Sequence, residues 1–91
     1  MYELSKTSQF KKDFKLMAKR KYDLSKLEVF LNLLISGDKL PAKYKEHPLK
    51  SNFKGYLDCH IESDWLIIFK RDETEKLITL VRTGTHSDIF G

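Results

Sequence analysis

The stretch YLDCHIESDWLIIFK, residues 56–70, decides the fold of this chain. Polar-tipped and apolar side chains alternate over its first six positions, and this period of two predicts a half-buried strand. The next three residues predict a tight turn, and the apolar run that follows predicts a central strand buried on both faces. On the first strand, alternation places Asp58 and His60 on one face and Cys59 on the other, among apolar side chains, which predicts that Cys59 is a core residue.

Downstream of this stretch, residues 76–82 alternate again and predict a third strand, which Gly84 ends. The pattern places Ile78, Leu80 and Arg82 on one face of that strand. Strands joined by such short turns pair as an antiparallel meander. A sheet of this kind covers one face with helices and leaves the other face available to a ligand.

Two amphipathic helices are predicted upstream of the sheet. Thr7 or Ser8 caps the first helix. The second begins at Ser25, which has the capping-box spacing to Glu28, and ends before Gly37. The short connection between them predicts an antiparallel helical hairpin. The apolar stripe predicted for the first helix consists of Phe10, Phe14, Met17 and Ala18.

The remaining segments complete an α+β fold. Residues 2–6 predict a short N-terminal strand, and residues 38–48 predict an irregular loop that carries His47. The expected order is therefore a short N-terminal strand, a two-helix hairpin, and an antiparallel β-meander with the helices on one face. With 91 residues, 41% hydrophobic and 33% charged, the chain is expected to be a single globular domain, residues 1–91.

Composition also excludes several classes of protein. Cys59 is the only cysteine, so no intramolecular disulfide can form. The first residues lack the apolar core of a signal peptide, and no apolar run approaches the ~20 residues that cross a bilayer. We therefore expect a soluble, cytoplasmic protein with no membrane partner.

The net charge of +4 is unevenly distributed. Residues 1–54 carry 13 Lys and Arg against 6 Asp and Glu, whereas residues 55–91 carry 4 against 7. A basic half beside a histidine-bearing half is typical of a protein that holds a polyanion with one surface and acts on it with another. The alternative is that the lysines are solvated faces of helices, and charge alone does not decide between the two.

The residues that can carry chemistry are concentrated in the C-terminal half. All three histidines, His47, His60 and His86, lie there with Asp64 and Arg82. Imidazoles exchange protons near neutral pH, and a guanidinium stabilises a developing negative charge, so this set predicts an active site that needs no metal.

Less specific interpretations stand beside this one. A single histidine on a strand is usually structural, and three histidines with Cys59 or Asp64 can also form a zinc site, although none of them has close ligand spacing. Local pattern favours packing over base stacking for Trp65. For Phe90, stacking on a nucleobase and burial against the sheet edge are equally open.

Several of these rare residues follow one another in a fixed order and spacing. They form the strings His47-Pro48-Leu49, Lys54-Gly55-Tyr56, Asp58-x-His60-x-Glu62-x-Asp64-Trp65, Arg82-Thr83-Gly84-Thr85-His86 and Phe90-Gly91. Over essentially the whole chain, this order resembles the YafQ branch of the RelE/ParE toxin superfamily. The resemblance implies a RelE-like fold.

The resemblance also implies an activity and partners. It implies the toxin of a bacterial type II toxin–antitoxin pair, an endoribonuclease that enters the ribosomal A site and cuts messenger RNA there. The implied partners are a cognate antitoxin protein, the ribosome and the message, with operator DNA contacted only through the antitoxin complex. No cofactor is implied.

Carried over residue by residue, the resemblance assigns roles to particular side chains. His47, His60, Asp64 and His86 match acid–base positions, and Arg82 matches an arginine that contacts phosphate. Trp65 and Phe90 match positions linked to activity and are expected to bind substrate. The lysines expected to contact RNA are Lys54 and, on the basic first helix, Lys11, Lys12 and Lys15.

Chemistry supports the implied reaction, because RNA carries its own nucleophile in the 2′-OH. Cleavage needs a base, an acid and a positive charge at the phosphate. We expect His86 to transfer a proton, with Asp64 or His60 as its counterpart and Arg82 as the charge stabiliser. Two alternatives are a non-catalytic inhibitor of gyrase, like ParE members of the superfamily, and a basic nucleic-acid-binding module without catalysis.

Overall fold

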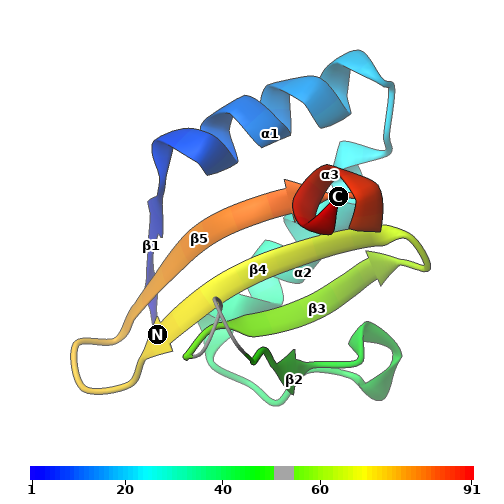
Figure 1. The fold of residues 1–91 in the computed structure, drawn as a ribbon. Helices are drawn as coiled ribbons and strands as arrows, with labels where there is room; N and C mark the ends of the chain where they lie inside the picture. The colour runs from blue at the N-terminus through cyan, green and yellow to red at the C-terminus, as the bar shows by residue number, and fades with distance from the viewer. Residues whose placement is uncertain (51–54) are drawn as a thin grey trace.

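The computed structural model describes residues 1–50 and 55–91, and Figure 1 shows its helices and strands. In chain order they are β1 (Glu3–Lys6), α1 (Ser8–Lys19), α2 (Leu24–Ser36), the 3₁₀ turn η1 (Ala42–Tyr44), β2 (His47–Pro48), β3 (Leu57–Glu62), β4 (Trp65–Asp72), β5 (Leu77–Gly84) and α3 (His86–Phe90). None of the helices in these described ranges is long and apolar enough to cross a membrane.

The sheet has the strand order β1-β5-β4-β3-β2. Strands β2 to β5 pair antiparallel in sequence, which confirms the predicted meander, but β1 lies parallel to β5 with Glu3 opposite Leu77. The sheet is therefore mixed. The predicted loop is partly wrong, because His47 and Pro48 pair with β3 as an edge strand. Proline is tolerated there because an edge position needs no backbone N–H.

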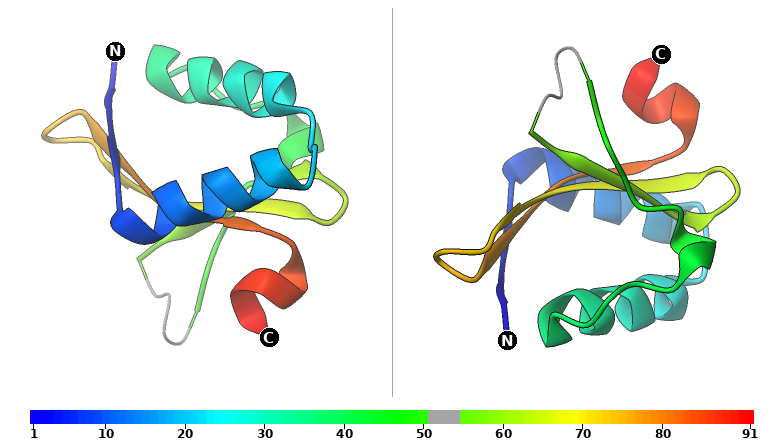
Figure 2. Two further views of the ribbon diagram at one scale, coloured as in Figure 1. Left: turned by 90° about the horizontal axis from the view of Figure 1, so that it is seen from above. Right: turned by 90° about the horizontal axis from the view of Figure 1, so that it is seen from below.

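A hydrophobic core fills the space between the sheet and the two long helices, which cover the same face (Figure 2). Residues 65–69 of β4 are fully buried, which confirms the predicted central strand, and Cys59 is a core residue as predicted. Burial raises the pKa of the Cys59 thiol to about 12, so the thiol stays protonated at neutral pH. The helices contribute Phe10 and Met17 from α1, and Leu27, Phe30 and Leu34 from α2.

Two sequence predictions about α1 and α2 need correction. On α1, Phe14 is 38% exposed and Ala18 is exposed, whereas Asp13 is buried. Asp13 occupies the inward position because it accepts a hydrogen bond from a backbone N–H of β5. On α2, Asp23 rather than Ser25 is the N-cap, since its carboxylate accepts the backbone N–H of Ser25 at 3.1 Å and the helix begins one residue earlier.

The second face of the sheet is partly covered by α3, which the sequence analysis did not predict. This helix lies opposite α1 and α2 (Figure 2), and its Ile89 packs on Leu66 and Ile68. Thr85 and Asp88 form a capping box at its start, and the Thr-x-x-Asp spacing was a signal for a helix here. The two helices of the predicted hairpin share one face of the sheet, as expected, and α3 occupies part of the face expected to be open.

A register shift between β4 and β5 changes the predicted face of Arg82. Leu80 pairs with Phe69, but Arg82 pairs with Ile68, so one extra residue is accommodated in β5. Phe69 belongs to the core under the helices, whereas Ile68 belongs to the cluster under α3. The predicted common face of Arg82 with Ile78 and Leu80 is therefore wrong.

Candidate active site

Two strands and a helix bring the three histidines together on the α3 side of the sheet. His47 lies opposite Asp58 in the register of β2 and β3, and His60 is two residues further along β3 on the same face. The helix α3 begins at His86. The ring centroids of His47 and His60 are 6.4 Å apart, and those of His60 and His86 are 5.8 Å apart. The structure thus assembles imidazoles that are up to 39 positions apart in the chain.

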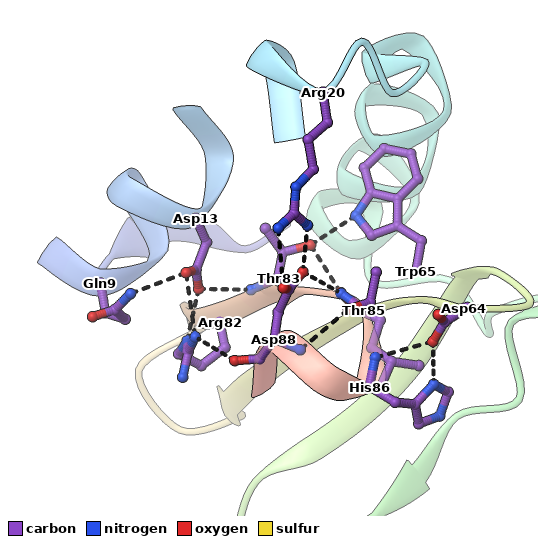
Figure 3. Close-up of polar contacts among 11 residues, drawn as sticks. Gln9, Asp13, Arg20, Asp64, Trp65, Arg82, Thr83, Thr85, His86 and Asp88 are labelled. Carbon is purple, nitrogen blue, oxygen red and sulfur yellow. Dashed lines mark hydrogen bonds and ion pairs between the residues drawn. The ribbon is translucent and has the colours of Figure 1, made fainter. Parts of the chain in front are cut away.

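Asp64, in the β3–β4 turn, holds His86 in place. The backbone N–H of His86 donates to Asp64 Oδ1 at 3.0 Å, and the same oxygen contacts Nδ1 of the imidazole (Figure 3). These hydrogen bonds hold the pKa of Asp64 below its usual range, so this carboxyl is ionised at neutral pH. With Nδ1 facing the carboxylate, Nε2 is the atom of His86 that can exchange a proton.

Asp58 is a buried carboxylate beside the three histidines. Its side chain is 6% exposed, its Oδ2 lies 3.4 Å from Nε2 of His47, and its Oδ1 has no hydrogen-bond partner among the described residues. Desolvation raises the pKa of Asp58, and the nearby charges of His47, His60 and His86 lower it in part. Asp58 thus faces imidazoles and not lysines. Glu62, at the end of the same strand, forms an exposed ion pair with Lys26 at 3.4 Å.

Arg82 is bound to other protein groups in this structure. Its Nε donates to Asp13 Oδ2 at 2.7 Å, and its Nη2 donates to Asp13 Oδ1 and to the backbone carbonyl of Asp88, both at 3.3 Å (Figure 3). Asp13 also accepts the backbone N–H of Thr83 at 3.1 Å. Arg82 therefore joins α1, β5 and α3, and replacing it removes a structural link as well as a cation.

A second arginine fixes α3, and so fixes His86. Arg20, just after α1, donates two hydrogen bonds to Asp88, at 2.7 and 3.2 Å. The Arg20 guanidinium and the N-cap hydrogen bonds of Thr85 lower the pKa of Asp88 to about 2. A Cβ at Gly84 would lie 3.0 Å from the Asp88 side chain, so this close approach requires glycine. Asp13, Arg20 and Asp88 were not predicted as site residues, because the contacts that link them to the site, Asp13 with Arg82 and Arg20 with Asp88, join positions 69 and 68 apart.

Trp65 and Phe90 have different surroundings. Trp65 is fully buried, its Nε1 donates to Thr83 Oγ1 at 2.9 Å, and its ring packs edge-on against Tyr22. The expectation that Trp65 binds substrate directly is therefore wrong, because no surface of the indole is available for stacking. Phe90 is 48% exposed at the end of α3.

The lysines expected to bind RNA lie on a different layer from the histidines. Lys11, Lys12 and Lys15 are exposed on α1, which covers the opposite face of the sheet (Figure 2). Lys11 and Lys15 border a cavity of about 310 Å³ next to Phe14. Lys54 lies outside the described residues.

The alternative zinc site is not assembled. Among residues 1–50 and 55–91, no three His, Cys, Asp or Glu side chains are grouped as metal ligands. Cys59 points into the core under α1 and α2, away from the histidines. The site instead contains three closely spaced imidazoles and two carboxylates. Asp64 is ionised and exposed, whereas Asp58 is buried.

Removing the negative charge of Asp58 is expected to stabilise the protein and weaken its function. A carboxyl whose pKa is raised by folding binds its proton more tightly in the folded state, so its contribution to the free energy of unfolding falls as pH rises through the folded-state pKa. Asp58→Asn should therefore raise the melting temperature at neutral pH, by ~4–8 °C if the gain is about 1 kcal/mol.

The pH dependence provides the control for this variant. The gain in melting temperature should disappear below the unfolded-state pKa of ~3.9, where both proteins are neutral at this position. Activity should fall, because His47 loses its carboxylate partner. A melting temperature that is lower than wild type at every pH would show that the Asp58 carboxylate stabilises the fold.

Comparisons with known proteins agree with one another. The sequence model for the bacterial toxin of type II toxin–antitoxin systems, YafQ, matches residues 2–91. The mRNA interferase toxin YafQ of Escherichia coli BL21-DE3 is 48% identical over 90 residues, which cover 98% of this chain and 96% of that protein. The crystal structure of YafQ from E. coli BL21(DE3) superposes with a TM-score of 0.93 at 44% identity, and the YafQ-like chain of the E. coli DinJ–YafQ complex with 0.91 at 46% identity, each over 100% of both chains.

Proposed function

This chain belongs to the YafQ family of bacterial type II toxins, and from that premise we propose that it is an mRNA interferase that cuts messages on the ribosome to inhibit translation. The observation that carries the proposal is the grouping of His47, His60 and His86, with Asp64 bound to His86. A protein that acts only by binding has no need for imidazoles held at this spacing.

The proposed reaction uses the 2′-OH of the RNA as nucleophile and no metal. His86 carries one of the two proton transfers, because the Asp64 carboxylate orients its ring. Asp64 is engaged with the backbone and ring of His86, so we assign the second proton transfer to His60, whose ring lies 5.8 Å from that of His86. His47 lies beyond His60, with its Nε2 3.4 Å from Asp58 Oδ2.

Charge at the phosphate is assigned to Arg82, and a base contact to Phe90. The side chain of Arg82 is 23% exposed and keeps Asp13 as a partner, so a phosphate would share its guanidinium with that carboxylate. The half-exposed ring of Phe90 lies on the same short helix as His86, four residues away, and can stack on a base of the message.

The proposed partners are a cognate antitoxin, the ribosomal A site and the message, with operator DNA reached only through the antitoxin complex. The E. coli DinJ–YafQ complex supports the antitoxin, because its toxin chain matches this one over its whole length. A ribosomal site of action places the protein in the cytoplasm.

Mapping the ends of messages after induction in cells tests the proposal. We expect discrete cuts inside coding sequences at one fixed phase of the codon, and none on messages whose start codon has been removed. Cuts that ignore translation would contradict ribosome dependence. Arrested growth with intact messages and altered DNA supercoiling would indicate the gyrase inhibitor instead.

The basic surface of α1 is expected to strengthen ribosome binding. Replacing Lys11, Lys12, Lys15 and Lys19 by Gln should weaken association with ribosomes and reduce its salt dependence, since each phosphate contact contributes to the slope of log K against log salt. The rate of cleavage at saturating ribosomes should be unchanged, because these side chains lie on the layer away from the histidines. Unchanged binding with an unchanged slope would show that the lysines are only solvated.

A further inference from the structure

A cleft of about 530 Å³ opens at the edge of the sheet next to the histidines. The start of α2, the η1 turn and the β3–β4 turn form its walls. It exists because β2 pairs only with the first two residues of β3, which leaves the outer edge of the rest of β3 uncovered by a strand. The lining residues used below are Lys26, Lys43, Tyr44, Lys45, His60 and Glu62.

Three lysines give this cleft a positive wall. Lys43 and Lys45 flank Tyr44, which is buried and anchors the turn in the core. The ammonium group of Lys43 lies over the Tyr44 ring at 5.1 Å from its centroid. Lys26 enters from α2 and, among the residues that the structure describes, has the half-exposed Glu62 as its ion-pair partner, at 3.4 Å. This contact has a small energy, and an incoming phosphate can replace it.

His60 connects the cleft to the candidate active site. Its ring lies 5.8 Å from that of His86 and also lines the cleft. The backbone of the same turn positions a second histidine, because the carbonyl of Lys45 accepts a hydrogen bond from His47 Nδ1 at 2.9 Å. A strand of RNA cleaved between the imidazoles therefore has a basic cleft directly beside it.

We propose that this cleft binds the backbone of single-stranded messenger RNA flanking the cleaved bond, with Lys26, Lys43 and Lys45 contacting phosphates. This inference rests on the proposed function and adds a substrate site at the β3 edge of the sheet, separate from the lysines of α1. The volume of the cleft is within the range of sites that enclose a ligand group, and the lysines supply the charge that RNA requires.

The test measures equilibrium binding of a short single strand as a function of salt concentration. The strand is an RNA analogue with 2′-deoxy sugars, which lacks the 2′-OH nucleophile and cannot be cut. The variant Lys26→Gln/Lys43→Gln/Lys45→Gln is compared with the control Lys39→Gln/Lys70→Gln/Lys76→Gln, which removes the same charge from exposed positions outside the cleft. Three lost phosphate contacts should lower the slope of log K against log salt by about 2, because each contact to a single strand contributes ~0.7. The control should keep the wild-type slope.

Cleavage kinetics complete the test. On ribosomes the cleft variant should show a raised KM with kcat little changed, because its lysines lie outside the group of histidines. An unchanged salt slope would overturn the proposal, and so would a variant that loses antitoxin binding while it keeps RNA binding. Because RNA binding is measured without cleavage, a failure of the proposed nuclease function would appear separately, as an absence of cuts.

Discussion

His86→Ala is expected to lose about 10²–10⁴ in cleavage rate, the range for removal of one acid–base group, while the protein keeps its fold. The side chain of His86 is 53% exposed and contributes nothing to either hydrophobic cluster, and the hydrogen bond from its backbone N–H to Asp64 survives the substitution. The measurement is the single-turnover rate of message cleavage on programmed ribosomes.

The matched control is Ser87→Ala, an exposed position of the same helix. It should cleave at the wild-type rate, and both variants should melt within a few degrees of wild type. Asp64→Asn should resemble His86→Ala only in part, because it leaves the imidazole in place but removes the carboxylate that orients it. A folded His86→Ala protein that cleaves normally would remove His86 from the mechanism.

Ribosome dependence is the second large effect. The isolated protein is expected to cut free RNA poorly and to become efficient only on translating ribosomes. Its candidate groups lie on an exposed face, with His47 and His86 each about half exposed, and such a surface does little to orient a flexible RNA. Orientation of reacting groups can supply ~7–11 kcal/mol of a barrier, so a partner that holds the message in place can decide whether cleavage is seen.

The comparison uses one message at equal toxin concentration, with and without engaged ribosomes. We expect cleavage to be faster by several orders of magnitude with ribosomes, at sites in one codon phase. Ribosomes whose A site is blocked by a bound tRNA are the control and should protect the message. Comparable cutting in both conditions, at the same sites, would identify a self-sufficient ribonuclease.

Local pattern was sufficient where one physical signal acts over a few residues. The period of two over residues 56–61 predicted that Cys59 faces the core, and the apolar run after it predicted the central strand. Gly37 ends α2 in the left-handed conformation, at a φ of 78°, as its position predicted. Local pattern did not decide the N-cap of α2, because the side chains of Asp23 and Ser25 can both accept a backbone N–H. In the structure Asp23 is the N-cap, and the helix begins one residue earlier than predicted.

The order of rare residues in the second half was also sufficient to predict the family, which the match of the YafQ toxin model to residues 2–91 confirms. What the sequence alone determined is thus the class of fold, the buried central strand and the family. These are properties of periodicity and residue order, which are read along the chain.

Only the tertiary structure decided how the site is arranged. Asp13 meets Arg82 across 69 positions and Arg20 meets Asp88 across 68, and no local pattern encodes contacts of that separation. One extra residue in β5 changed the face of Arg82, and burial removed Trp65 from the substrate surface. The environment of a carboxylate was likewise a tertiary property: Asp58 and Asp64 are chemically identical and six residues apart, yet desolvation raises the pKa of one and hydrogen bonds lower that of the other.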